Sequence, residues 1–150
     1  MITTTDIRIR GVKKTQLRLT GMLLRSKTFE PIFIKAKKKL EAANVANFTA
    51  QGLPVGGWAP LDPTYAAWKM ARFPGRPMLI GDGSLFRSVA NLSRGVSSFG
   101  PTRAEFGTNV EYAKFHQYGT SKMPKRKIIF EPAGFAKSTA QDAARYVVGE

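Results

Sequence analysis

The sequence contains no cysteine, a single histidine (His116) and only ten acidic residues. Without cysteine, neither a disulfide framework nor a thiolate metal site can form, and one histidine is too few for a zinc centre. The acidic residues are scattered, and no close pair suits acid–base hydrolysis or a two-metal centre. These shortages argue against an enzyme and predict that the chain binds no metal and no cofactor.

Long hydrophobic runs are also missing. No stretch approaches the length of a membrane span, and the first residues, MITTTDIRIRG, lack the apolar core of a signal peptide. We therefore expect a soluble protein, made inside a cell, with no membrane partner. A length of 150 residues suits one domain, 1–150, that buries most of its apolar surface on folding.

Positive charge is abundant, since 24 lysines and arginines give a net charge of +14. Such a charge favours polyanions or acidic protein surfaces. The lysines at 35, 37, 38 and 39 form a run that could follow a nucleic-acid backbone. However, no recognition-helix or RNA-binding motif is present, and charge runs on a helix are more often solvated. Non-specific contact with DNA therefore stays an alternative function.

The first third of the chain predicts helices. Residues 2–10 alternate like a short strand, and from Val12 the apolar spacing becomes helical. Pro31 suits the first turn of a helix, so 12–50 is either two helices or one long helix kinked near Pro31. The lysine run is expected to be largely solvated. The apolar residues that can share one face are Phe33, Ala36, Leu40, Ala43 and Phe48.

The middle of the chain is rich in loops. Residues 51–58 (QGLPVGGW) and 73–77 carry the glycine and proline of loops. Asp62 or Thr64 could cap a short helix ending near Met70. The glycines around Asp82 indicate a tight turn rather than a phosphate-binding loop, because the sequence lacks the lysine of that motif. Ser84 then caps a turn of helix through residue 89.

Strands are predicted in the last third. Residues 96–99 and 102–106 flank Gly100–Pro101 as a hairpin, and residues 127–130 form another strand. A helix over 110–118 ends at Gly119 in the left-handed conformation, and a closing helix covers 135–147. The predicted fold class is α+β, with a small antiparallel sheet packed against a long N-terminal helical element, short helices and a C-terminal helix.

His116 is the residue that most invites a catalytic interpretation, because its ordinary pKa lies near neutrality. A general base needs a nucleophile and an orienting group within hydrogen-bond reach. Neither Glu111, Thr120 nor Ser121 offers a recognised spacing. We interpret His116 as a structural residue, hydrogen-bonded to the backbone at a helix end.

Four segments of the chain resemble the tail-completion, or virion-morphogenesis, family of long-tailed bacteriophages. The first carries Trp58, Pro60, Leu61, Thr64 and Lys69. The second carries Leu79, Asp82, Gly83, Leu85 and Ser88. The third carries Gly107, Thr108, Tyr112, Ala113, His116, Gln117 and Gly119. The fourth is MPKRKIIF, with Pro124 and Arg126.

The resemblance covers about two thirds of the chain and leaves residues 1–30 and the last helix outside it. Lys125 and Lys127 depart from the family, which usually has prolines around the arginine. The motif residues are our candidates for an interface, and the loops 51–58 and 119–126 are candidates for ordering on assembly.

What the resemblance implies is a structural protein of the virion, assembled in the host cytoplasm and placed at the head–tail junction. Such proteins often form a ring with sixfold symmetry. Their partners are other copies of themselves, the head-closure or connector proteins, and the tail-terminator or tail-tube proteins. Whether the basic surface meets a protein or packaged DNA stays open at this point.

Overall fold

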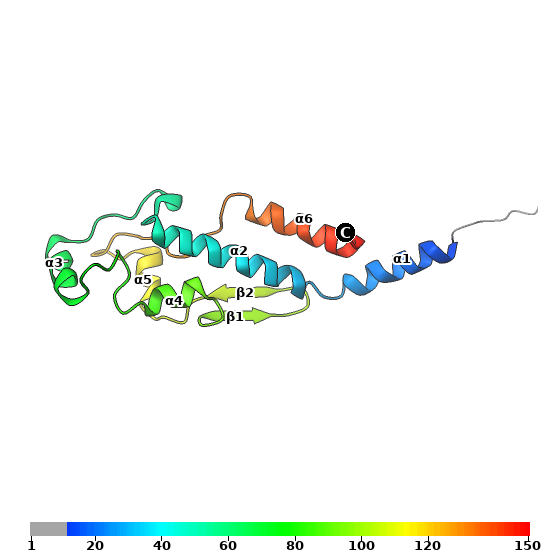
Figure 1. Ribbon diagram of the computed structural model, residues 1–150, viewed down its shortest axis with the longest axis horizontal. Coiled ribbons are helices and arrows are strands. Elements are labelled where there is room, and N and C mark those ends of the chain that lie inside the picture. The colour runs from blue at the N-terminus through cyan, green and yellow to red at the C-terminus, as the bar shows by residue number, and fades with distance from the viewer. Residues whose placement is uncertain (1–11) are drawn as a thin grey trace, which may run out of the picture.

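The structure, a computed structural model, describes residues 12–150, so the strand predicted over 2–10 lies outside the described residues. It is an elongated α+β molecule, as predicted (Figure 1). The helical elements are α1 (Val12–Arg25), α2 (Glu30–Thr49), the 3-10 turn η1 (Leu53–Val55), α3 (Pro63–Arg72), α4 (Ser84–Ala90), α5 (Ala113–Tyr118) and α6 (Phe135–Val148). The strands are β1 (Val96–Phe99) and β2 (Ala104–Gly107).

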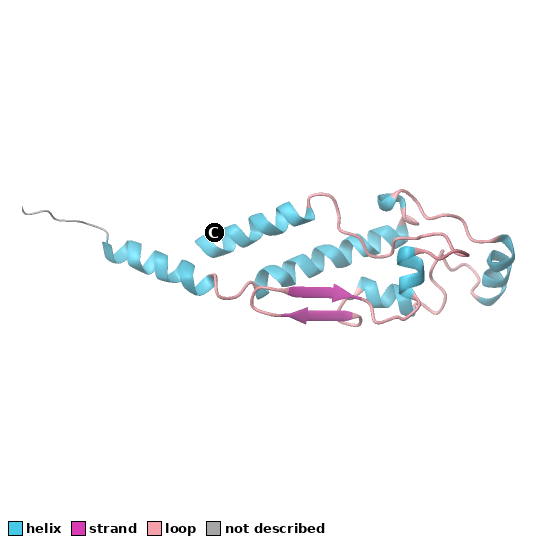
Figure 2. Cartoon of the chain, turned by 180° about the vertical axis from the view of Figure 1, so that it is seen from behind, coloured by secondary structure: helices cyan, strands magenta, loops and turns pink. Residues whose placement is uncertain are grey.

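Helix α2 is the spine of the molecule. It starts at Glu30 with Pro31 in its first turn, and a break after Arg25 separates it from α1, which confirms the two-helix alternative. Within the break, Phe29 N donates to Pro101 O at 2.7 Å and ties the start of α2 to the hairpin. Helix α6 and the hairpin run along α2 on opposite sides (Figures 1 and 2).

The buried face of α2 differs from the predicted one. Its buried residues are Ile32, Ala36, Asn44, Asn47 and Phe48. Phe33, Leu40 and Ala43 are only partly covered. Two asparagines take core positions because their amides donate to main-chain carbonyls of other segments, a use that apolar spacing alone cannot predict.

The lysine run of α2 is only partly solvated. Lys37 has 15% of its side chain exposed, hydrogen-bonds to Ser93 and lies 3.9 Å from Glu41, so the prediction of a solvated side chain is wrong there. Lys39 lies 2.8 Å from Asp142 of α6, and Lys35 lies 3.8 Å from the same carboxylate. Part of the basic charge therefore holds α6 against α2.

The predicted hairpin is confirmed with a shorter second strand. β1 pairs antiparallel with β2, with Val96 opposite Gly107 and Phe99 opposite Ala104. Gly100 N donates to Arg103 O at 2.7 Å and closes the turn. The turn uses the residues after Pro101, so β2 begins two residues later than predicted.

Two helix starts were predicted with different success. Asp62 caps α3, because its carboxylate accepts hydrogen bonds from the main-chain N–H groups of Thr64 and Tyr65. Ser84 does not cap α4: Gly83 stands at the cap, and Ser84 N donates to the Asp82 carboxylate at 3.1 Å.

Two predictions near the C-terminal third need correction. Residues 127–130 form no strand, because side chains rather than a neighbouring strand satisfy their main-chain groups. The helix predicted over 110–118 is limited to α5, since residues 110–112 form a turn that leads into it. The closing helix is confirmed as α6.

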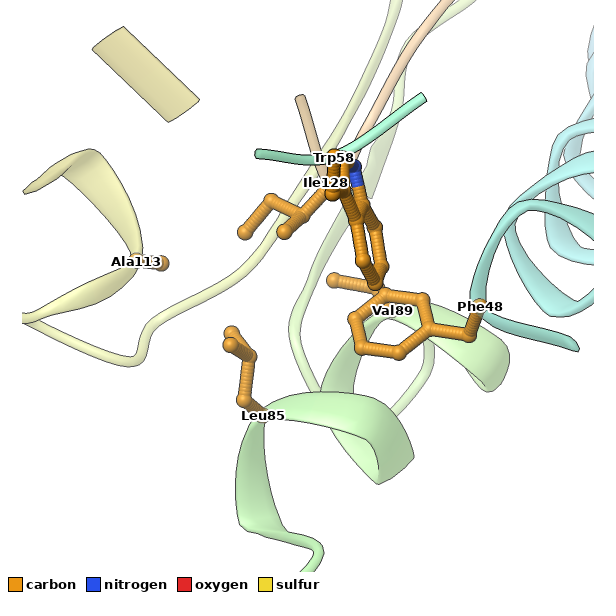
Figure 3. Packing of buried hydrophobic residues seen from close by; sticks show 6 residues of the cluster. All are labelled: Phe48, Trp58, Leu85, Val89, Ala113 and Ile128. Carbon is orange, nitrogen blue, oxygen red and sulfur yellow. The ribbon is translucent and has the colours of Figure 1, made fainter. Parts of the chain in front are cut away.

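The core lies where α2, α4 and α5 meet the loop segments that carry Trp58 and Ile128. Its buried residues are Phe48, Trp58, Leu85, Val89, Ala113 and Ile128. Figure 3 shows these side chains converging, with the Phe48 and Trp58 rings edge to face at a centroid distance of 5.1 Å. Gly52 is required for this packing, because a Cβ there would lie 2.3 Å from Trp58 Cδ1 and its φ is +82°.

Helix α1 stands apart from this core. It extends beyond the end of α2 and has no buried residue (Figure 1). Its C-terminal end meets α6, where Arg25 Nε donates to Val147 O at 3.0 Å. Within residues 12–150, no helix combines the length and the hydropathy needed to cross a bilayer.

Candidate functional site

The four motif segments come together around the main chain of residues 126–129. This segment crosses the end of the core without joining a sheet, and Ile128 lies 1% exposed within it. The Lys127 carbonyl accepts hydrogen bonds from Asn47 Nδ2 and Trp58 Nε1, each at 2.9 Å. Helix α2 and the loop after it therefore hold the segment from one side.

Gln117 of α5 holds the same segment from the other side. Its Oε1 accepts hydrogen bonds from the N–H groups of Ile128 at 2.9 Å and Ile129 at 3.1 Å. Its Nε2 donates to Ile129 O at 2.8 Å. One amide side chain thus satisfies three main-chain groups, as a neighbouring strand would, and explains why the predicted strand is absent.

Arg126 is buried beside Gln117, with 4% of its surface exposed. Its Nε donates to Ala59 O at 2.9 Å and its Nη2 donates to Pro60 O at 2.8 Å. Burial lowers the pKa of the guanidinium from its usual value, although an arginine stays charged at any physiological pH. The fourth motif is therefore bound to the first motif through the main-chain carbonyls of Ala59 and Pro60.

Lys69 plays a comparable part in the first motif. It is 7% exposed, and its ammonium donates to Arg76 O at 2.8 Å and to Pro77 O at 2.9 Å. Burial, and secondarily the charge of Arg76, lower the pKa of Lys69. The ammonium closes the loop that follows α3.

The second and third motifs meet through hydroxyl groups. Ser88 Oγ donates to Leu85 O at 2.8 Å and lies 2.6 Å from Thr108 Oγ1. Ser84 Oγ lies 2.9 Å from the Tyr112 hydroxyl. These contacts fix α4 against the turn that precedes α5. The third motif's Gly107 ends β2 opposite Val96.

Gly119 ends α5 with a positive φ, as predicted, but not in the left-handed helical region. Its φ is +77° and its ψ is 174°, a region that is essentially limited to glycine. A Cβ at this position would lie 2.9 Å from Lys125 N. The chain can therefore return to Arg126, whose N–H donates to His116 O at 2.7 Å.

His116 lies half-buried beside this return. Its main-chain carbonyl takes part in the bond to Arg126, but the imidazole Nδ1 is buried without a partner among the described residues, so the predicted backbone bond to the ring is wrong. Burial, and then the charge of Arg126, lower the pKa of the imidazole below its usual value. The lowered pKa favours the neutral imidazole at pH 7. The imidazole packs edge to face with the Tyr112 ring, and the two ring centroids lie 6.1 Å apart.

A cleft of about 820 Å³ opens between α3 and α5. His116, Lys69 and Arg126 form part of its lining, and the Lys69 and Arg126 side chains donate to main-chain carbonyls. Over residues 12–150, no group of three or more potential ligands is placed to hold a metal ion. The apolar part of the lining includes Leu61, Tyr65, Phe73, Leu79, Phe115 and Pro124.

The structure thus brings the motif residues into one connected region but gives them two different surroundings. Trp58, Leu85 and Ala113 are core residues, whereas Leu61 and Pro124 line the cleft. Pro60 is exposed, and its main-chain carbonyl accepts the hydrogen bond from Arg126.

Sequence reasoning missed three amide residues that complete the region. Asn44 Nδ2 donates to Val89 O at 3.0 Å, Asn47 holds Lys127, and Gln51 Oε1 accepts from Met78 N at 3.1 Å. The available signal was spacing along α2, since Asn44 precedes the core residue Phe48 by one helical turn and Asn47 is its direct neighbour.

Comparison with known proteins agrees with the resemblance of the four segments and extends it. No curated protein and no solved structure matches the chain. A family comparison, however, matches residues 11–149, so that α1 and α6 fall inside the match although the motif resemblance had left them out. A match over this much of the chain shows that the protein belongs to the phage virion morphogenesis family.

Proposed function

We propose that this protein is a non-enzymatic adaptor of the head–tail junction, which completes the tail and joins it to the capsid. In this proposal, copies of the chain form a closed ring, of sixfold symmetry in the simplest case. The ring contacts the head-closure or connector proteins on one side and the tail-terminator or tail-tube proteins on the other. A ring of this kind uses heterologous contacts, in which one patch meets a different patch of the next copy.

The observation that carries the proposal is that the polar motif residues form hydrogen bonds with main-chain groups. Gln117, Arg126 and Lys69 each bind at least two main-chain groups of neighbouring segments. Such side chains fix the shape of a body rather than act on a substrate. The family to which the chain belongs is one of virion assembly, and a body whose shape is held by such hydrogen bonds suits that role.

The test is electron microscopy of particles made by a phage that lacks this chain. We expect full heads and separate tails, with joining restored when the chain is supplied from a plasmid. Particles with heads joined to tails in the absence of the chain would refute the adaptor proposal. A variant carrying His116→Gln should restore joining, because the proposal gives the imidazole no chemical task.

A second candidate function, non-specific contact with packaged DNA, is favoured by the charge of α1. Lys13, Lys14 and Arg18 have no acidic partner among the described residues, unlike the lysines of α2 that pair with acids. Filter binding to short duplex DNA should be weak and steeply dependent on salt. A tight, sequence-selective complex at physiological salt would instead favour a DNA-binding protein as the primary function.

A further inference from the structure

Helix α3 carries an exposed aromatic surface at one end of the molecule (Figure 1). Tyr65 and Trp68 are 50% and 54% exposed, and their rings stack with centroids 5.4 Å apart and an angle of 28° between the planes. Phe73 meets the Trp68 ring edge to face at 6.1 Å, and the Arg72 guanidinium lies 5.7 Å from the Phe73 centroid. These four residues form the α3 platform.

The platform lies on the outer side of α3. Tyr65, Trp68 and Arg72 are spaced by three and four residues and therefore share one side of the helix. Lys69, by contrast, is buried and closes the loop after the helix. The other tryptophan, Trp58, is 8% exposed and belongs to the core. Stacked aromatic rings at the surface, unlike those of a core, are free to contact a partner.

Positive charge surrounds the α3 platform. The segments 61–82 and 111–127 both line the cleft beside it, and they contain eight basic and three acidic residues, an excess of five positive charges. Arg72, Arg76 and Lys122 are exposed. None of these three forms an ion pair with an acidic residue in the part of the chain that the structure describes.

The other charged groups of the cleft lining are engaged locally. Asp62 accepts hydrogen bonds from two main-chain N–H groups at the start of α3, and Asp82 accepts from the N–H and the hydroxyl of Ser84. Lys69 and Arg126 donate to main-chain carbonyls. A partner that contacts the α3 platform therefore meets aromatic ring faces together with exposed, unpaired cations.

An unpaired nucleic-acid strand matches both properties. Its phosphates are attracted to arginine and lysine, and its bases offer flat faces that stack on exposed aromatic rings. In a duplex the base faces are already stacked on one another, so that only the charge would be used. An acidic protein surface likewise matches the charge but does not require the stacked rings.

We propose that the α3 platform binds single-stranded nucleic acid, with unpaired bases stacked on Tyr65 and Trp68 and phosphates contacting Arg72, Arg76 and Lys122. This inference goes beyond the proposed adaptor and does not depend on ring formation. It also differs from the contact of α1 with duplex DNA, because it requires unpaired bases. DNA and RNA share the chemistry that the platform recognises.

Fluorescence anisotropy of labelled oligonucleotides tests the proposal on the full chain. At physiological salt, an oligothymidine of about 15 nucleotides should bind more tightly than a duplex of the same length. A surface that attracts nucleic acid by charge alone would prefer the duplex, since the duplex has the higher charge density. An oligouridine of the same length distinguishes RNA from DNA. A duplex that binds as tightly as both single strands would overturn the proposal.

Trp68 separates stacking from other apolar contact. Trp68→Leu keeps an apolar side chain without a ring, and it should weaken binding of the single strand roughly 10-fold or more. Trp68→Phe keeps a ring and is the matched control, which should bind nearly as the natural chain does. Both variants should keep the natural thermal unfolding, because Trp68 is exposed. Equal binding by the two variants would show that no base stacks there and refute the proposal.

A second pair of variants tests the cations without changing the rings. Arg72→Gln/Arg76→Gln should weaken single-strand binding and reduce the slope of its salt dependence by about 1.4, as expected for two lost phosphate contacts. Lys13→Gln/Lys14→Gln removes the same charge from α1, at the opposite end of the molecule, and should weaken single-strand binding less. An equal loss in the two double variants would place the strand elsewhere.

The adaptor function and this inference fail in different ways. If Trp68→Leu binds the single strand like the natural chain but fails to restore joining of heads to tails, the platform contacts a protein. The nucleic-acid proposal is then wrong and the adaptor function stands. If heads and tails join without the chain, the adaptor function is wrong, whatever the oligonucleotides show.

Discussion

Gln117 offers the sharpest test of how the site is held. Gln117→Met keeps nearly the same shape and removes all three hydrogen bonds to Ile128 and Ile129. At about 1 kcal/mol for each bond, the change should lower the free energy of unfolding by about 3 kcal/mol. For a chain of this length that corresponds to a fall of roughly 6–12 °C in Tm. Thermal and urea unfolding followed by circular dichroism measure both quantities.

Hydrogen exchange locates the effect of Gln117→Met. The amides of Ile128 and Ile129 should lose protection in the variant, while those in the centre of α6 change much less. Gln141→Met is the matched control, because Gln141 is exposed on α6, and it should change stability by less than about 0.5 kcal/mol. If Gln117→Met behaves like this control, the side-chain bonds do not hold the segment and the reasoning is refuted.

Three further predictions concern the other contacts of the fold. Trp58→Phe removes the donor to the Lys127 carbonyl and part of the core volume, and should cost roughly 2 kcal/mol in urea unfolding. Lys39→Gln breaks the pair with Asp142, and should speed amide exchange in α6 while changing global stability less than Trp58→Phe does. The pKa of His116 is lowered on folding, so the unfolded chain binds the proton more tightly. Its contribution to stability is therefore complete above its ordinary pKa of 6.5 and is lost as the pH falls from there toward the folded value.

Each of these predictions has an outcome that would contradict it. Lys38→Gln matches Lys39→Gln, because Lys38 is exposed on the same helix, and equal exchange in the two variants would show that the pair with Asp142 does not hold α6. His116→Gln should flatten the slope of stability against pH just below pH 6.5. A slope that survives this change must come from another group. Trp58→Phe without any loss of stability would show that Asn47 alone suffices to hold the carbonyl.

The elements that sequence reasoning predicted well depend on local chemistry. Pro31 in a first turn and Asp62 at a cap act on main-chain groups within a few residues, and both helices start where expected. Gly100 and Pro101 likewise turn the hairpin at the predicted place. The α+β class followed from these signals, and the family followed from the order and spacing of four short motifs.

The elements that were predicted wrongly depend on contacts between distant segments. Residues 127–130 have the apolar pattern of a strand, yet Gln117, Asn47 and Trp58 occupy the positions where a neighbouring strand would bond. Lys37 belongs to a run that the sequence predicts to be solvated, but its ammonium hydrogen-bonds to Ser93 and pairs with Glu41. His116 was rightly expected to lie near a helix end and wrongly expected to bond through its ring.

The sequence by itself thus determined where the chain turns, where its helices begin and which family it resembles, because capping, proline and glycine act over a few residues. Only the tertiary structure decided what the motif residues do. Arg126 and Gln117 could have been surface groups for a partner, and the fold instead packs them against main-chain carbonyls and N–H groups. The same fold leaves the cleft between α3 and α5 open and α1 without a buried residue at the opposite end of the molecule, because these features depend on how distant segments pack.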